Sequence, residues 1–342
     1  MSTKSFGMFD WVDSRGVPLH QLYDERIRLV QAAEAGGFYC YHLAEHHATP
    51  LGMAPSPSLF LSALARETST IHLGPLVYLL PAYNPMRLVE EICMLDNLSH
   101  GRLEVGVGRG ASPFELAHLG VDVSKQRELF AEALEVVLAG LRTERLTHKG
   151  ASFSYENAPV EVRPYQQPAP PFWYAASNPE SVAWCGRNAI NMLHGGTASG
   201  ARSNFDLYFE TWEAHKDDPA RINVNVTAPR VGLTRQVFVA DTDEGAMTVA
   251  RAAHALWSKS FVKLWHEYGD THLDPRTDFD RACSGGAVIV GSPETVRHTV
   301  AQHFEESGGN YLMGSFAWGG LTPEQSLHSI DLFAREVMPA FA

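Results

Sequence analysis

The chain has 342 residues, of which 45% are hydrophobic and 19% are charged, a composition typical of a globular enzyme rather than a disordered or fibrous protein. No apolar run reaches the ~20 residues that a membrane-spanning helix needs. The formal net charge of −12 would repel a polyphosphate backbone and argues against nucleic acid as a partner. Any bound phosphate must therefore be held by individual arginines and backbone N–H groups.

Two features predict a cytoplasmic protein. Residues 1–11, MSTKSFGMFDW, run directly into a strand-like segment without the basic region, apolar core and cleavage site of a signal peptide. The four cysteines stand far apart and form no C-x-x-C pair, which indicates buried, reduced thiols.

Strand-like and helix-like segments alternate along the whole chain, which predicts an α/β fold with a parallel sheet covered by helices. We expect one domain, residues 1–342, with eight strands arranged as a (β/α)₈ TIM barrel. The expected strands are 4–11, 38–44, 71–80, 102–108, 172–177, 189–193, one within 223–240, and 310–316.

The expected helices carry clear end signals. Gly36-Gly37 stops the first helix, and Asn84-Pro85 and Ser292-Pro293 begin two later ones. Thr322-Pro323 opens the last helix with a Thr-x-x-Gln capping box. Two irregular segments remain: 142–171 predicts an insertion before strand five, and 258–286 predicts an insertion after strand seven that forms a long active-site loop.

Catalytic groups of such a barrel lie at the C-terminal ends of its strands. Glu45-His46-His47 follows strand two, and a histidine there is either a structural residue or a general base or hydrogen-bond donor. A metal site is disfavoured because adjacent histidines point in different directions and the H-E-x-x-H spacing is absent.

Two further segments are candidate anion sites. The run GVGRG, residues 106–110, follows strand four but has G-x-G-x-G spacing, so it is not a dinucleotide fingerprint. We interpret its glycines as room for a ligand, with Arg109 facing a phosphate or, alternatively, forming a surface salt bridge. Ser177 precedes a helix that starts near Pro179, which is either an anion site or a plain helix start.

Three segments together resemble the bacterial luciferase-like flavin monooxygenases. They are AEHH with GPLVYLLPAYNPMRLVEE, then LDNLSHGRLEVGVGRGASPFELAHLG, and the C-terminal run from GSPETVRHTV to DLFAREVMP. The resemblance implies a (β/α)₈ barrel that binds FMN at its C-terminal mouth, with a non-prolyl cis peptide behind the flavin, here Leu76-Val77. It also implies that His46 is catalytic. The residues implied for the cofactor are Leu76, Val77, Gly108, Arg109, Arg127 and Ser177, with the backbone of Glu180 and Ser181 capping the phosphate.

The same resemblance implies the reaction. Reduced FMN arrives from a separate flavin reductase, since no nicotinamide fingerprint is present, and O₂ adds to give a C4a-hydroperoxide. Oxygen then passes to a small, largely apolar substrate such as an aldehyde, ketone or alkene. We expect Phe6, Met8 and Trp11 to line the substrate pocket, and we expect a homodimer. Gly108 stands where the light-emitting enzymes have a reactive cysteine, which argues against bioluminescence.

Two alternatives stay open. One is a dehydrogenase on the same fold that uses the deazaflavin coenzyme F420 and transfers hydride without oxygen. The other is a non-catalytic flavin-binding subunit. The EHH run favours the monooxygenase over the dehydrogenase, and the combination of His46, Arg109 and Ser177 argues against a non-catalytic subunit.

Overall fold

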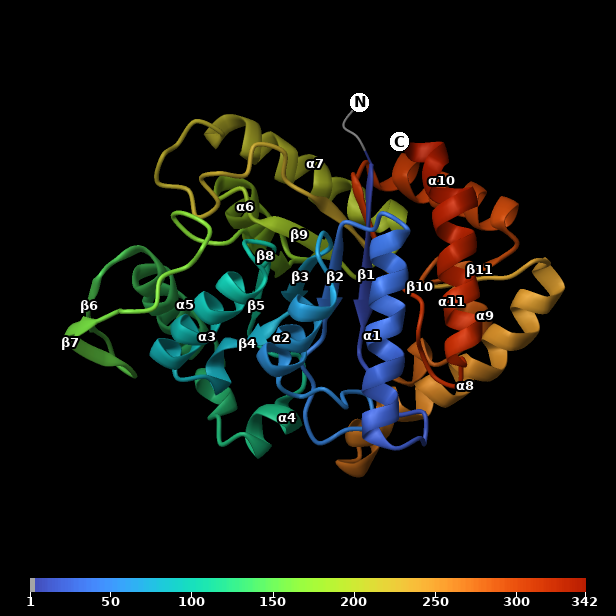
Figure 1. The fold of residues 1–342 in the computed structure, drawn as a ribbon, viewed down its shortest axis with the longest axis horizontal. Coiled ribbons are helices and arrows are strands. Elements are labelled where there is room, and N and C mark those ends of the chain that lie inside the picture. Colours follow the sequence, from blue (N-terminus) through green and yellow to red (C-terminus); the bar gives the residue numbers. More distant parts are fainter. Residues whose placement is uncertain (1–3) are drawn as a thin grey trace.

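The computed structural model describes residues 4–342. Residues 1–3, part of the stretch in which we saw no signal peptide, lie outside the described residues. The core is a sheet of ten parallel strands (Figure 1). The strands are β1 (Ser5–Asp10), β2 (Cys40–Leu43), β3 (His72–Pro75), β4 (Tyr78–Leu79), β5 (Val105–Gly108), β8 (Phe172–Ala175), β9 (Asn191–His194), β10 (Val231–Val239), β11 (Val288–Gly291) and β12 (Tyr311–Ser315).

The sheet closes into a barrel because β3 and β4 are two halves of one strand. β3 pairs with β2, and β4 pairs with β5. A bridge between Leu73 and Leu103 adds a contact from β3 to the segment before β5. The peptide bond between the halves, Leu76-Val77, is cis, as the resemblance implied. Eight strand positions therefore surround the barrel, with β11 added outside on β10, and the expected (β/α)₈ architecture is confirmed.

Helices cover the outside of this sheet (Figure 1). Their apolar stripes face the strands; in α5, for example, Leu134, Val137 and Leu141 are buried. The end signals are confirmed by Asn84 and Ser292 caps and by the Thr322 capping box. The helices are α1 (Leu19–Ala35), α2 (Pro57–Glu67), α3 (Pro85–Leu98), α4 (Pro113–His118), α5 (Gln126–Arg142), α6 (Pro179–Arg187), α7 (Ala198–His215), α8 (Asp243–Glu267), α9 (Phe279–Ser284), α10 (Pro293–Ser307) and α11 (Pro323–Leu332).

Both insertions stand where the sequence predicted them, but the second is more ordered than expected. The first contains an antiparallel hairpin, β6 (Arg145–Lys149) and β7 (Ser154–Pro159), which projects from the barrel in Figure 1. In the second, α8 continues to Glu267, so the expectation of an irregular loop from residue 258 onward is wrong for its first ten residues. The reason is a buried stripe that runs along α8 through Ala250, Trp257 and Val262.

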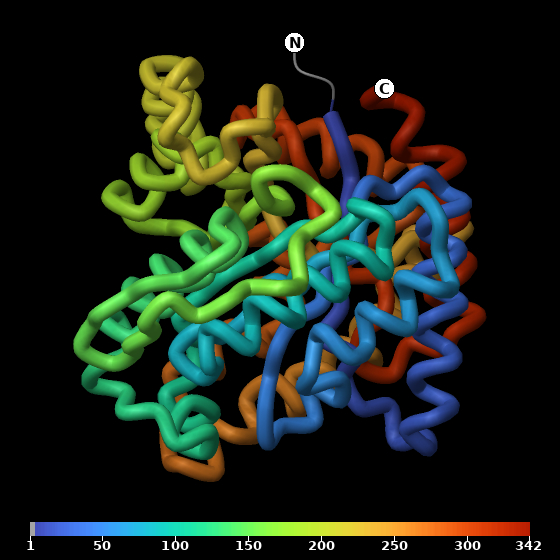
Figure 2. Tube along the Cα trace, turned by 60° about the vertical axis from the view of Figure 1, so that its left-hand side comes forward, coloured from blue at the N-terminus to red at the C-terminus, as the bar shows by residue number. Residues whose placement is uncertain are grey.

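The C-terminal ends of the strands lie opposite the chain ends. Figure 2 shows both termini at one end of the barrel, and the segment that follows α8 at the other end beside α4. The Phe114 and Tyr268 rings stack there with centroids 4.4 Å apart. His118 Nε2 lies 2.8 Å from the Tyr268 hydroxyl. The loop after β5 and the second insertion therefore meet across the barrel mouth.

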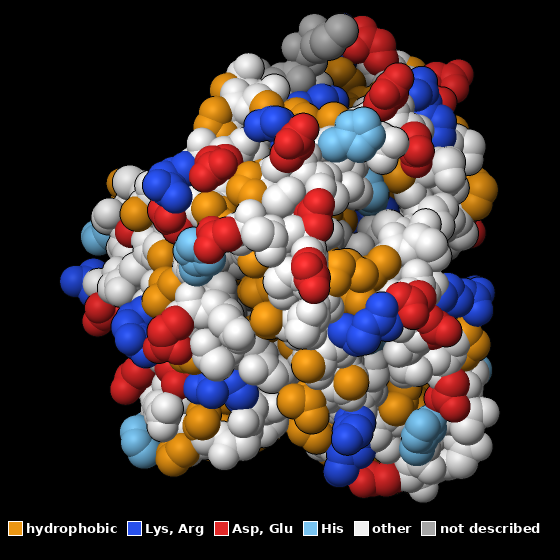
Figure 3. All heavy atoms as spheres, turned by 90° about the vertical axis from the view of Figure 1, so that its right-hand side faces the viewer, with side chains coloured by type: hydrophobic (Ala, Val, Ile, Leu, Met, Phe, Trp, Pro, Cys, Tyr) orange, Lys and Arg blue, Asp and Glu red, His pale blue; other side chains and the backbone are white. Residues whose placement is uncertain are grey.

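On the side that carries α8 to α11, the outer surface has no large patch of one charge. Lysines and arginines alternate with acidic side chains there (Figure 3). Within residues 4–342, no helix is both long enough and apolar enough to cross a membrane.

Candidate active site

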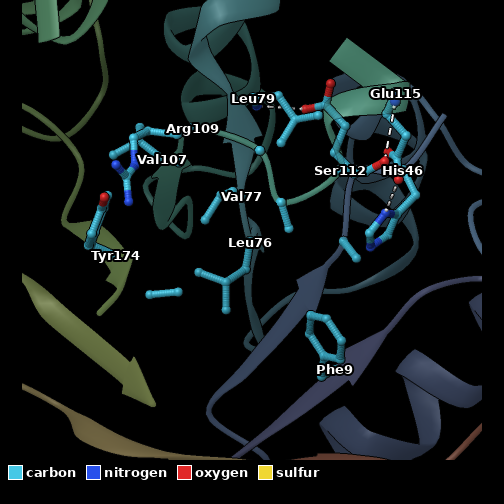
Figure 4. A pocket seen from close by; sticks show the side chains of 16 residues that line it. Phe9, His46, Leu76, Val77, Leu79, Val107, Arg109, Ser112, Glu115 and Tyr174 are labelled. Carbon is cyan, nitrogen blue, oxygen red and sulfur yellow. Dashed lines mark hydrogen bonds and ion pairs between the residues drawn. The ribbon is translucent and has the colours of Figure 1, made fainter. Parts of the chain in front are cut away.

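A cavity of about 370 Å³, called the main cavity here because His46 and Arg109 both line it, opens at the C-terminal ends of the barrel strands. Phe9, His46, Leu76, Arg109 and Tyr174 are among the residues that line it. In Figure 4, Leu76 and Val77 lie between two groups of polar side chains, Arg109 with Tyr174 on one side and His46 with Glu115 on the other. The cavity therefore has an apolar middle and polar ends.

Glycines in β5 let strand three pass close behind this cavity. A Cβ added to Gly108 would lie 2.4 Å from Val77 Cγ2, and one added to Gly106 would lie 2.2 Å from the Pro75 carbonyl oxygen. Any larger residue would push the two strands apart. We expected the glycines to make room for a ligand directly; in the structure, the immediate neighbour is strand three, whose Leu76 and Val77 then face the cavity.

His46 is oriented by a buried carboxylate. Its Nδ1 lies 3.1 Å from Glu115 Oε1, and the His47 backbone N–H donates to Glu115 Oε2 over 2.9 Å. Glu115 is held in turn by Ser112, the N-cap of α4, whose hydroxyl accepts from the Glu115 N–H. The carboxylate favours a proton on Nδ1 of His46, which leaves Nε2 of a neutral imidazole as an acceptor.

His47 belongs to a different network. Its Nε2 lies 2.9 Å from Glu45 Oε1, while Glu45 Oε2 accepts from the Leu79 N–H and the Tyr83 hydroxyl at 3.1 and 3.0 Å. Burial and the adjacent Glu45 raise the pKa of Tyr83. This network ties the loop after β2 to strand three. Of the two adjacent histidines, only His46 lines the main cavity.

A second cavity, of about 290 Å³, continues from the first and shares Arg109 and Tyr174 with it. Arg127, Glu180 and Ser181 also line it. The Gln126 side-chain amide donates to the Arg109 and Gly110 carbonyls at 2.9 and 2.8 Å, which fixes the start of α5 against the loop after β5. Two arginines and the N-terminus of α6 thus converge, an arrangement that suits an anion.

Ser177 lies just outside this arrangement. The cap of α6 is Asn178, whose side chain accepts from the Ser181 backbone N–H over 3.0 Å. Ser177 is exposed, and its carbonyl oxygen accepts from the Asn204 amide at 3.1 Å. The predicted helix start near Pro179 is confirmed, but its cap is Asn178 and not Ser177. One of the two backbone groups assigned to a phosphate, the Ser181 N–H, already has an internal partner.

The structure corrects the assignment of the pocket walls on β1. Phe6 packs edge-on against Phe304 and Phe333 of the outer helical layer, with centroids 5.8 and 5.4 Å away. Met8 is fully buried in the same apolar core. Side chains alternate along a strand, so Phe6 and Met8 share one face of β1, and Phe9, on the other face, lines the main cavity. Trp11 lines a third cavity, described below.

Cysteines and metal ligands play no visible part in these cavities. Cys40, Cys93 and Cys185 are buried, as expected, whereas Cys283 is half-buried, and burial raises its pKa to about 11. Within residues 4–342, no group of three or more His, Cys, Asp or Glu side chains is placed to hold a metal ion.

Comparison with known proteins identifies the family. The chain is 37% identical to the uncharacterized protein y4wF of Sinorhizobium fredii, over 98% of this chain and 97% of that protein. It is 28% identical to the oxygenase component of the flavin-dependent trigonelline monooxygenase of Acinetobacter baylyi, over 94% and 91% of the two chains.

Its fold also matches a solved structure in complex with FMN, the oxygenating constituent of 3,6-diketocamphane monooxygenase from Pseudomonas putida. The TM-score is 0.82 at 21% identity, with 100% and 99% of the chains covered. The model of the family described as luciferase-like monooxygenase matches residues 5–311. The chain belongs to the luciferase-like monooxygenase family.

Proposed function

We propose that this monooxygenase is the oxygenase component of a two-protein system. A separate flavin reductase supplies reduced FMN, and an oxygen atom from O₂ is transferred to a small organic molecule with a largely apolar body, of the aldehyde, ketone or alkene type. The observation that carries the proposal is the pair of connected cavities, one with an apolar floor and the other with two arginines.

The residues present fit FMN. A flat ring system needs an apolar floor, which Leu76 and Val77 provide beside Gly108. A phosphate dianion needs cations and N–H groups at the other end, where Arg109 and Arg127 line the second cavity beside the N-terminus of α6. Burial raises the pKa of Tyr174, whereas the adjacent Arg109 lowers it, so a neutral hydroxyl remains available as a hydrogen-bond donor between the two ends.

Bound reduced FMN supplies the electrons that activate oxygen, and the chain supplies the surroundings. His46 is the catalytic residue in this proposal, because its Nε2 is free while Glu115 holds Nδ1. It accepts a proton from, or donates one to, the reacting oxygen group. Phe9, Leu76 and Val77 keep water from the reaction side of the cavity.

The partners follow from the same reasoning. A separate reductase is supported by the relative that is named as an oxygenase component and by the lack of a nicotinamide fingerprint in this sequence. We further propose that residues 1–342 act as one domain and that the protein is a cytoplasmic homodimer.

The test is oxygen incorporation from isotopically labelled O₂. The purified protein is mixed with chemically reduced FMN, labelled O₂ and a panel of ketones, aldehydes and alkenes, and products are read by mass spectrometry. We expect labelled product, and we expect His46→Ala to lower its formation by about 10²- to 10⁴-fold. The exposed His20 offers the matched control, because His20→Ala leaves the cavity unchanged.

Two outcomes would contradict the proposal. Tight FMN binding without labelled product from any compound would favour the non-catalytic subunit. Full turnover in His46→Ala would remove His46 from the catalytic role.

A further inference from the structure

A third cavity, of about 380 Å³, lies beyond the C-terminal end of β9, beside β10 and the start of β11. Its walls come from the loop after β9, from the middle of β10, and from α8, α9 and the start of β11. Three aromatic side chains line it, Trp11, Trp257 and Phe261. The Trp257 and Phe261 rings stack with centroids 4.7 Å apart. The cavity is large enough for a small organic molecule with a flat body.

The charged side chains that line this cavity are arginines. Arg235, Arg276 and Arg281 line it, and no aspartate or glutamate does among the described residues. In a chain with 39 acidic and 27 basic residues, a wall with three arginines and no carboxylate is not what composition predicts. The main cavity, by contrast, has Glu45 and Glu115 beside its arginine. The third cavity is therefore suited to an anion.

Arg235 is the central feature because it is buried without a counter-ion. Only 1% of its surface is exposed, and its Nη1 and Nη2 donate to the Thr234 and Gly196 carbonyls at 2.8 and 3.0 Å. Its Nε has no hydrogen-bond partner, and no carboxylate of residues 4–342 forms an ion pair with it. Burial lowers the pKa of Arg235 to about 10, so it stays charged near neutral pH at a cost in desolvation.

Three more buried nitrogen atoms on residues that line this cavity lack partners. They are the Gln236 side-chain amide nitrogen, the Trp257 indole nitrogen and His254 Nε2. Buried polar groups in proteins are almost always hydrogen-bonded, so each exception needs a reason. Here four unpartnered nitrogen atoms occur in the walls of one cavity. Three of them, on Arg235, Gln236 and Trp257, carry N–H donors, and a ligand that brings acceptor oxygens would supply what these donors lack.

The third cavity and the main cavity share walls with the same intervening space. A narrower space of about 250 Å³ shares Phe261 and Arg276 with it, and shares His46 and Glu115 with the main cavity. Trp11 also packs edge-on against Phe9, the wall of the main cavity, with centroids 4.7 Å apart. A molecule anchored at Arg235 can therefore extend along the aromatic side chains toward His46.

We propose that this third cavity recognises the substrate through a carboxylate, with Arg235 as its binding residue, so that the substrate is a small carboxylate with a flat apolar body. The proposal names the substrate class for the function proposed above and rests on it. A carboxylate fits better than a phosphate group because Arg235 is the one buried cation of this wall, whereas Arg276 and Arg281 are exposed, and because the walls are aromatic.

Calorimetric titration of the full-length protein tests this without turnover. The probes are benzoate, phenylacetate and hexanoate, each against its neutral amide, with inorganic phosphate as an anion that lacks an apolar body. We expect at least one carboxylate to bind about 10-fold or more tightly than its amide and more tightly than phosphate. Equal binding of every acid and amide, no binding of any acid, or preferential binding of phosphate would overturn the proposal.

Variants test whether Arg235 gives the preference for acid over amide. In Arg235→Met, which keeps length and removes charge, the preference for acid over amide should vanish, and in Arg235→Lys it should survive in part. Arg251→Met is the matched control, because Arg251 is exposed and paired with Asp280 outside the cavity. A preference that persists in Arg235→Met contradicts the assignment.

Reduced FMN binding, measured on the same samples, separates this proposal from the flavin proposal. FMN binding relies on Arg109 and Arg127, so retained FMN binding shows that Arg235→Met is folded. Carboxylate selectivity without FMN binding would remove the proposed flavin function and leave the carboxylate site. FMN binding without carboxylate selectivity would remove the carboxylate site and leave the proposed flavin function.

Discussion

Two buried arginines at opposite ends of the barrel differ in how their donors are used. Arg102 lies before β5, at the N-terminal end of the strands, and only 9% of it is exposed. Its Nε donates to the Ser99 carbonyl, and its Nη groups donate to Ala65, Thr68 and Ile71, five bonds in all between 2.8 and 3.2 Å. The protein itself supplies every acceptor.

Arg235 makes two bonds to carbonyls and leaves Nε without a partner. It lies on β10 beside the C-terminal end of β9, where a barrel of this kind places its binding groups. The difference indicates that Arg102 stabilises the fold, whereas Arg235 is arranged for a ligand. Stability and ligand binding should therefore respond to different arginines.

The largest effect on stability is expected for Arg102, at the N-terminal end of the strands. Arg102→Met removes all five donors and leaves buried carbonyl oxygens without partners, which should lower the free energy of unfolding by about 3 kcal/mol or more. Urea unfolding followed by circular dichroism measures this. A loss below about 1 kcal/mol would mean that Arg102 is not the structural residue the comparison requires.

At the C-terminal end of the strands, Arg109→Ala should weaken FMN binding and leave stability nearly unchanged. Loss of a charged hydrogen-bond donor to the phosphate costs about 1.5–3 kcal/mol, which corresponds to FMN binding weaker by about 10- to 150-fold. Anaerobic ultrafiltration with reduced FMN gives the dissociation constant, and urea unfolding should show a change below about 0.5 kcal/mol. If stability falls and FMN affinity does not, the contrast between the two ends fails.

Arg235→Met should leave stability unchanged or raise it by about 1 kcal/mol, because a buried cation without a counter-ion is replaced by an apolar side chain of similar length. The midpoint of thermal unfolding is the measurement. A clear destabilisation would show that Arg235 supports the fold as Arg102 does.

The smallest effect is expected for an arginine that neither supports the core nor lines a cavity. Arg251 is exposed and pairs with Asp280 at 2.6 Å, so Arg251→Ala should change the free energy of unfolding by less than about 1 kcal/mol. Urea unfolding of this variant also sets the background for the other three. A larger loss would mean that surface pairs contribute more here than the comparison assumes.

The fold was predictable because it follows from local patterns. Apolar strands, helix caps such as Asn84, Ser292 and Thr322, and turn glycines all lie close together in the sequence and agree with one another. The cis bond at Leu76-Val77 followed from the resemblance rather than from local chemistry.

The site was predictable only in part, because several of its features are set by distant segments. Phe6 and Phe9 lie on one short strand, and both faces of that strand are apolar, so the sequence alone did not tell which face lines the cavity. Ser177 and Asn178 are both residue types that cap helices, and in the structure Asn178 is the cap. Arg235 carried no signal, because its lack of a partner depends on loops far away in sequence.

Binding of reduced flavins to the purified protein without oxygen tests the central claim most directly. Reduced FMN and the reduced deazaflavin coenzyme compete for the wild type and for Arg109→Ala, and the retained cofactor is identified by its absorbance. We expect the wild type to retain FMN in preference to the deazaflavin and Arg109→Ala to lose it. Preferential retention of the deazaflavin would contradict the account and favour a hydride-transferring dehydrogenase.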